Sequence, residues 1–201
     1  MSEGEQRTRN HRLFVALEPP DAVRRRLAAI DVELRRAAGR AADEIRWVPP
    51  ENVHLTLQFL GAVPEERVPD VETAIRAAAA AARPLSLEVK GAGGFPNARR
   101  PRVVWAGLTG DLTALAALAA DLGRRLAPLG FPPEERPFSA HLTLGRAREG
   151  RGAPGIAGAL ASAAEAAGAP WRATEAVLFE SHLSPKGPRY EAIAHAPLGG
   201  G

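Results

Sequence analysis

The chain alternates between short apolar stretches and longer stretches in which apolar residues recur every three or four positions. Short runs rich in Val, Leu, Ile and Phe are typical of buried strands, whereas the longer spacing is typical of helices that lay one face on a sheet. We therefore expect strands at 12–17, 53–60, 85–90, 102–108, 139–146, 176–179 and 190–194. We expect helices at 21–38, 64–82 and 111–126, and a weak surface helix in the Gly- and Ala-rich segment 152–168.

The order of these elements predicts an α+β fold with mostly antiparallel sheets. Two pairs of strands follow each other directly, across the basic, turn-rich loop 91–101 and across the loop 184–188, and strands arranged in this way pair as hairpins. The polar residues 1–10 are expected to form a flexible tail, and residues 11–201 a single domain with two lobes.

One short sequence occurs twice, as VHLTL at 53–57 and as AHLTL at 140–144. Each copy falls in an expected strand, and each half of the chain has two helical segments. This repetition predicts two similar lobes related by a pseudo-twofold axis, with the helices packed outside and an active-site cleft between the lobes.

The repeated motif places polar side chains on one face of each strand. Successive residues of a strand point to opposite faces, so His54 and Thr56 share a face while their leucine neighbours point the other way. In the second copy His141 and Thr143 share a face in the same manner. If the two strands face each other, they form a pocket lined by two imidazoles and two hydroxyls.

Such a pocket suits cleavage of a phosphodiester. Near neutral pH one imidazole can accept a proton while the other donates one, as general acid/base catalysis requires. The threonine hydroxyls can donate hydrogen bonds to the non-bridging oxygens as negative charge develops. This scheme needs no cofactor and no metal.

Other classes of function remain open at this point. A single His-x-Thr in a strand is more often a packing feature, and the chain could also be a non-catalytic module that binds RNA or nucleotides. A metal site on the two histidines would have a poor ligand set, because neither motif contains Cys, Asp or Glu.

Composition narrows the class of protein. The chain has no cysteine, which excludes disulfides and thiolate chemistry and favours a reducing cytoplasm. No apolar run reaches the ~20 residues that span a bilayer, so we expect no membrane association. The 26 basic residues include only two lysines; this arginine bias reflects coding composition in the first place, although guanidinium groups also bind phosphate well.

The sequence resembles the two-histidine (2H) phosphoesterases, and among them the RNA 2′,3′-cyclic phosphodiesterases, also called 2′-5′ RNA ligases. The similar segments span most of the chain: RLFVALEPP (12–20), RWVPPENVHLTLQFLG (46–61), GFPNARRPRVVWAGL (94–108), HLTLGR (141–146) and LFESHLSPKGPRYEAIAHAPL (178–198). The resemblance implies a fold of two antiparallel lobes with the active site between them, and hydrolysis of a terminal 2′,3′-cyclic phosphate to a 2′-phosphate. We expect RNA ends or cyclic nucleotides as substrates, and a monomer. Ligation to a 2′-5′ linkage at the same site is the alternative.

The resemblance also implies roles for individual residues. It makes His54 the proton donor and His141 the acceptor, although the near-symmetry of the motifs does not order them. It suggests Phe14 and Arg146, and more weakly Arg46, as substrate-binding residues. For contact with the RNA body we expect the cluster of Arg99, Arg100 and Arg102. We expect no role for His11, His182 and His195, and we expect the three tryptophans Trp47, Trp105 and Trp171 in the core.

Overall fold

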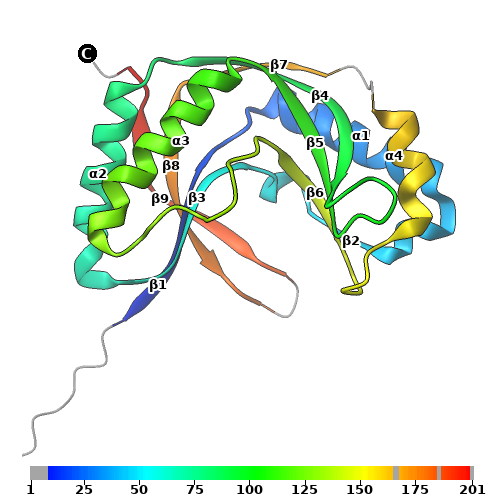
Figure 1. Ribbon diagram of the computed structural model, residues 1–201, viewed down its shortest axis with the longest axis horizontal. Helices are drawn as coiled ribbons and strands as arrows, with labels where there is room; N and C mark the ends of the chain where they lie inside the picture. The colour runs from blue at the N-terminus through cyan, green and yellow to red at the C-terminus, as the bar shows by residue number, and fades with distance from the viewer. Residues whose placement is uncertain (1–8, 165–167, 185–186, 200–201) are drawn as a thin grey trace, which may run out of the picture.

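The structure, a computed structural model, describes residues 9–164, 168–184 and 187–199 and contains two sheets flanked by helices (Figure 1). The strands of the four-stranded sheet, in spatial order, are β3 (Leu55–Pro64), β1 (Asn10–Leu17), β8 (Glu175–His182) and β9 (Arg189–Pro197). Those of the five-stranded sheet are β2 (Ile45–Trp47), β6 (Leu142–Ala147), β5 (Val103–Gly110), β4 (Leu85–Phe95) and β7 (Pro170–Ala173). All of these strand pairs are antiparallel, which confirms the α+β prediction.

The helices cover the outer faces of the two sheets. Helices α2 (Val68–Ala81) and α3 (Leu112–Leu126) lie beside the four-stranded sheet, and α1 (Asp21–Ala38) and α4 (Ala157–Ala163) lie beside the five-stranded sheet (Figure 1). Each helix buries an apolar stripe in the core; in α1 the stripe is Val23, Leu27, Ile30 and Leu34, spaced as one helical face requires. None of these four helices covers the inner face of either sheet (Figure 1).

Each sheet with its two helices is called a lobe below, and neither lobe is one half of the sequence. The four-stranded lobe takes β1 and β3 from the start of the chain and β8 and β9 from its end. Helix α1 leaves β1 yet packs in the other lobe, and α3 likewise follows β5 across to the four-stranded lobe. The lobes are therefore interleaved, and they cannot be divided at a single point of the chain.

Several expected boundaries were wrong, and packing explains the clearest of them. The loop expected at 91–101 is shorter, because β4 continues through the glycines to Phe95. A Cβ atom on Gly93 would lie 2.4 Å from the indole of Trp105, and one on Gly94 would lie 2.5 Å from Pro101. These glycines serve a close approach within the sheet and not a turn.

The other differences are mostly shifts at element ends. The strand expected at 53–60 is Leu55–Pro64, the one at 139–146 is Leu142–Ala147, and the helix expected at 64–82 begins at Val68 after a 3₁₀ turn. Strands β2 and β7 were missed, because three- and four-residue strands carry little pattern. Parts of the tail 1–10, the helix 152–168 and the loop 184–188 lie outside the described residues.

The core beneath the repeated motif yields a test of the fold. Leu142 is fully buried, so Leu142→Ala removes apolar contacts and leaves a cavity, which should lower the free energy of unfolding by about 2–5 kcal/mol. Urea denaturation measures the change. The control Leu183→Ala, at a side chain that is 74% exposed, should stay within about 0.5 kcal/mol of the parent. Equal stabilities for the two variants would contradict the packing described here.

Candidate active site

His54 lies immediately before β3 on the inner face of the four-stranded sheet, against a bed of aromatic side chains. Its ring centroid is 4.6 Å from that of Phe14 and 5.1 Å from that of Tyr190, which meets it edge to face. Phe179 lies beneath, with its ring stacked on Phe14 at 5.3 Å. The aromatic bed removes His54 from water on one side and limits the directions in which its ring can turn.

His141 occupies the equivalent position before β6 in the other lobe. Its ring meets Phe95 edge to face at 5.0 Å, and Phe95 in turn lies 5.3 Å from Trp105. In each lobe, therefore, the residue just before the motif strand is a histidine that packs on a phenylalanine.

Both imidazoles are held by the same hydrogen bond. Nδ1 of His54 lies 2.8 Å from the carbonyl oxygen of Asn52, and Nδ1 of His141 lies 2.7 Å from that of Ser139. A carbonyl oxygen only accepts hydrogen bonds, so Nδ1 carries the proton in both rings. In the neutral rings Nε2 is the nitrogen left to exchange a proton with a ligand.

Arg24 and Asn52 hold the turn in front of His54. The Arg24 guanidinium donates to the carbonyl oxygens of Pro19 and Glu51, at 3.0 and 2.8 Å, which ties this turn to the start of α1. The Asn52 side chain donates to the carbonyl oxygen of Pro188 at 2.9 Å, just before Tyr190. The carbonyl that orients His54 is thus fixed to two other parts of the chain.

A β-bulge follows the threonine in each motif strand. Thr56 pairs with Ala16 and Gln58 with Val15, which leaves Leu57 as the extra residue. In the other lobe Leu144 is the extra residue, because Thr143 pairs with Trp105 and Gly145 with Val104. A bulge shifts the later residues to the opposite face, so the fifth residue after each histidine joins the threonine on the inner face.

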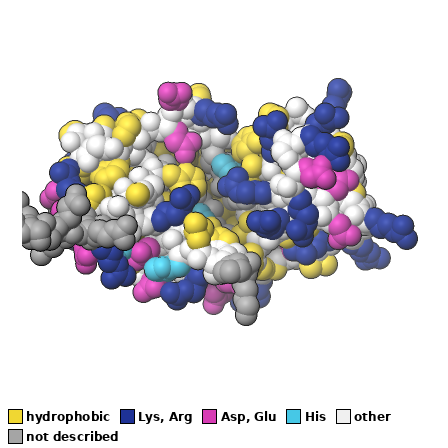
Figure 2. All heavy atoms as spheres, turned by 90° about the horizontal axis from the view of Figure 1, so that it is seen from below, with side chains coloured by type: hydrophobic (Ala, Val, Ile, Leu, Met, Phe, Trp, Pro, Cys, Tyr) yellow, Lys and Arg dark blue, Asp and Glu magenta, His cyan; other side chains and the backbone are white. Residues whose placement is uncertain are grey.

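These fifth residues are Phe59 and Arg146. Arg146 stands directly opposite Arg46 on β2 and Val103 on β5, in one row with Phe95, so the two candidate arginines lie side by side on the inner face. Phe59 stands opposite Phe14. Figure 2 shows histidine side chains in the hollow between the lobes, with basic side chains at its border.

The surroundings of the two histidines disfavour their charged forms. Burial lowers the pKa of His54 from 6.5 to about 4, with the positive charges of Arg146, Arg24 and His141 adding to the effect against the hydrogen bond to Asn52. Burial likewise lowers the pKa of His141, again with a contribution from Arg146, whereas Glu134 acts in the opposite direction. The cleft is therefore positively biased and prepared for an anion.

All seven expected site residues lie on this inner surface or at its edge: His54, His141, Thr56, Thr143, Phe14, Arg46 and Arg146. Sequence reasoning missed Tyr190 and Phe95, which contact the two histidines. Burial raises the pKa of Tyr190, against the opposing effect of Arg146. Tyr190 was expected at the start of a strand and Phe95 in the loop 91–101, and no local pattern indicates that either side chain reaches a motif histidine.

Two of the three tryptophans lie in or against the core, as expected, and one does not. Trp171 is buried and Trp47 packs against the core, where its Nε1 donates to the carbonyl of Ala42. Trp105 instead shares the inner face with Thr143, its cross-strand neighbour. Its partly exposed ring lies over Gly93, because a glycine partner leaves room for an indole flat on the sheet.

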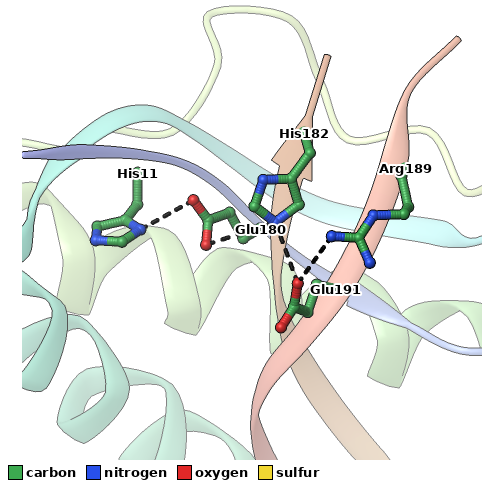
Figure 3. A network of polar contacts seen from close by, with 5 residues as sticks. All are labelled: His11, Glu180, His182, Arg189 and Glu191. Atoms are coloured by element: carbon green, nitrogen blue, oxygen red, sulfur yellow. Dashed lines mark hydrogen bonds and ion pairs between the residues drawn. The ribbon is translucent and has the colours of Figure 1, made fainter. Parts of the chain in front are cut away.

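The other three histidines pair with acidic side chains and are not part of the two motifs. His11 Nδ1 is 2.9 Å from Glu180, and His182 lies between Glu180 and Glu191, at 3.8 and 3.3 Å (Figure 3). His195 pairs with Glu175 at 3.3 Å. Within the described ranges, no group of three or more His, Cys, Asp and Glu side chains is placed to hold a metal ion.

Arg100, from the cluster expected to contact the RNA body, lines a separate open hollow of about 550 Å³. The hollow lies beyond the end of β6, away from His141, and mixes cations with acids: Arg40, Arg148 and Arg151 with Asp43, Glu44 and Glu149. The ion pair between Arg151 and Glu149 neutralises part of its charge. No helix in the described part of the chain is long and apolar enough to cross a membrane.

Comparisons of the sequence with known proteins all point to one family. The model of the LigT-like phosphoesterase family matches residues 17–105 and 110–190. A protein of Archaeoglobus fulgidus named RNA 2′,3′-cyclic phosphodiesterase is 36% identical over 184 residues, which cover 90% of this chain and 97% of the relative. A protein of the same name from Thermus thermophilus is 33% identical and covers 94% of this chain and 91% of its own.

Solved structures agree with the sequence comparison. The protein TT0787 of Thermus thermophilus superposes with a TM-score of 0.75 at 30% identity, covering 94% of this chain and 98% of the other. Escherichia coli LigT complexed with 3′-AMP gives a TM-score of 0.70 at 27% identity, with 94% and 99% covered. The same E. coli protein has also been crystallised with ATP and with NADP+.

The lowered pKa of His54 makes stability depend on pH. In the unfolded chain His54 binds a proton near pH 6.5, but in the folded protein only near pH 4, so the unfolded state binds more protons between these values. The folded state should therefore lose up to about 3 kcal/mol from this group as the pH falls through that window. His54→Asn, whose amide can still donate to the Asn52 carbonyl, should lose correspondingly less.

Urea denaturation of both proteins at about pH 7.5 and about pH 4.5 measures the difference. A parallel loss of stability in the parent and in His54→Asn would show that another group causes the acid sensitivity.

Proposed function

The chain belongs to the LigT-like phosphoesterases of the two-histidine superfamily, and we propose that it hydrolyses RNA 2′,3′-cyclic phosphate ends to 2′-phosphomonoesters. One observation carries the proposal. Two imidazoles from equivalent positions of a duplicated motif are held by the same Nδ1–carbonyl bond, which leaves both Nε2 atoms available in a positively biased cleft. The relatives named RNA 2′,3′-cyclic phosphodiesterase support the choice of substrate.

In the proposed reaction the histidines move two protons. Nε2 of His141 accepts a proton from water as the water oxygen attacks phosphorus, and the bond between phosphorus and O3′ breaks. Nε2 of His54 gives its proton to the departing O3′, so the products carry a 2′-phosphate and a 3′-hydroxyl. Both histidines return to their starting states after exchange of one proton each with solvent.

Thr56, Thr143 and Arg146 would stabilise the negative charge that develops on the non-bridging phosphate oxygens. Both threonines share the inner face with the histidines, where their hydroxyls can donate to the two non-bridging oxygens. The positive charge of Arg146 acts on both imidazoles, and the same placement supports contact with an anionic phosphate. Arg46 beside it would bind a further phosphate, and Phe14 would fix the ring of His54.

Binding of the substrate would favour the protonated form of His54, which is the form that can act as the acid. In the free protein burial favours neutral His54, which has no proton to give from Nε2. A phosphate anion between the rings opposes this effect, because a nearby negative charge raises the pKa of a histidine. Bound phosphate therefore increases the fraction of the protein in which His54 carries the proton that it gives to O3′.

We further propose that residues 11–201 act as one bilobal unit, as a monomer in the cytoplasm. One chain supplies both histidines, and the interleaved lobes support their joint folding. The absence of cysteine agrees with a reducing compartment.

The reaction is tested with a short RNA that ends in a 2′,3′-cyclic phosphate, in the presence of EDTA. The parent protein should form the 2′-phosphate, and His54→Ala and His141→Ala should each lower kcat by about 10²–10⁴-fold, since each removes one proton transfer. Product isomers are identified by chromatography. A 2′-5′ linked product would instead indicate ligation.

The matched control for this experiment is His11→Ala. His11 stands in the same sheet but on the opposite face of β1 from Phe14, bonded to Glu180, so its loss should change kcat by less than about threefold. Full activity in His54→Ala and His141→Ala, or abolition of turnover by EDTA alone, would refute the metal-free two-histidine reaction.

The lowered pKa values also predict the pH dependence of the reaction. The productive free protein carries one protonated and one neutral ring, and both pKa values lie below 6.5. We therefore expect kcat/KM to be maximal below pH 6.5 and to fall about tenfold per pH unit above its optimum. The optimum of kcat should lie at higher pH, because bound phosphate raises both pKa values. Identical optima for kcat and kcat/KM would contradict this account.

A further inference from the structure

Gln58 is the one polar side chain in the described part of the chain that is buried as deeply as the apolar core. It lies in β3, shortly after His54, and is 5% exposed. Its Nε2 donates to the carbonyl oxygens of Phe131 and Pro132, at 2.9 and 3.4 Å, whereas its Oε1 has no hydrogen-bond partner among the described residues. A buried oxygen without a partner lowers the stability of a protein. Packing of the core therefore does not account for an amide at this position.

The β-bulge at Leu57 turns the side chain of Gln58 away from the cleft. Without the extra residue Gln58 would share the inner face with Thr56, but with it Gln58 lies on the outer face of the sheet, toward α3. In α3 a Cβ atom on Gly123 would lie 3.0 Å from Pro133 and 3.6 Å from Oε1 of Gln58. The glycine thus leaves room in the helix surface for the amide and for the chain that the amide binds.

The carbonyl groups that Gln58 binds belong to the segment that leads to His141. Residues 131–141 run from the region after α3, in the four-stranded lobe, past the edge strand β3 to β6 in the five-stranded lobe (Figure 1). Residues 132–140 belong to no helix or strand, and within the described part of the chain no backbone–backbone hydrogen bond holds them. The Gln58 amide therefore anchors the start of this segment, and near its end the Ser139 carbonyl holds Nδ1 of His141.

We propose that Gln58 is the positioning residue of His141. By binding the start of the segment at the edge strand β3, it fixes the point from which the chain crosses to the other lobe. It thereby fixes the place of the Ser139 carbonyl and of the ring that this carbonyl orients. His54 directly precedes the same strand, so β3 places both histidines, one directly and one through this amide. The inference rests on the proposed function, since it assumes that both rings act on one phosphate.

The first test is Gln58→Met, which nearly keeps the volume of the side chain but removes the hydrogen-bond donors. We expect kcat on an RNA that ends in a 2′,3′-cyclic phosphate to fall about 10- to 100-fold, since a displacement of ~1 Å has effects of this size, while KM changes less than about threefold. In the His141→Ala background the same substitution should change kcat by less than about twofold, because the ring that Gln58 places is already absent. The control Ile75→Val, which removes a buried methyl group from α2, should leave kcat within about twofold of the parent.

Proton NMR of the five histidine rings gives a readout that needs no turnover. In Gln58→Met the C2 proton resonance of His141, assigned by its loss in His141→Ala, should shift, whereas those of His11 and His195 should keep their positions. An unchanged His141 resonance, an unchanged kcat, or a loss of kcat as large in the His141→Ala background as in the parent would each overturn the proposal. Failure of the proposed function takes another form, in which the parent protein cleaves no cyclic phosphate, and the histidine resonances then decide the role of Gln58 alone.

Discussion

The site depends on the burial of the leucines that alternate with its polar residues. Leu55 and Leu57 in one strand, and Leu142 and Leu144 in the other, are all buried, and their burial turns the threonines to the open face of each sheet. Leu57 and Leu144 are also the bulged residues. The same packing that holds each lobe together therefore presents the chemistry, and the bulge adds one further inward residue per strand.

Desolvation gives the cleft its electrostatic character. The surrounding side chains shield both imidazoles partly from water, and the positive charge of Arg146 opposes the protonation of both. A neutral imidazole whose Nδ1–H is already bonded to a carbonyl can only gain a proton at Nε2. An anion in the cleft would compensate both the desolvation and the repulsion, which agrees with the phosphate substrate proposed above.

The interleaved topology keeps the two halves of the site in register. Because β1, β3, β8 and β9 come from both ends of the chain, and because α1 and α3 each pack in the lobe opposite to the strand before them, many crossings connect the lobes. The turn before His54 shows the effect locally. It is bonded through Arg24 to the start of α1 and through Asn52 to the chain just before β9. The position of the histidine is fixed by contacts between distant segments.

The sequence alone determined the class of fold, the two repeated His-x-Thr motifs and the face that they share in each strand, because strand alternation and motif repetition are local properties. It misjudged the glycines of β4 and the place of Trp105, and it gave no sign that Tyr190 and Phe95 would contact the histidines. The bulges, which bring Phe59 and Arg146 to the inner face, were equally hidden. These features depend on pairing between strands far apart in the chain, and only the tertiary structure decides that register.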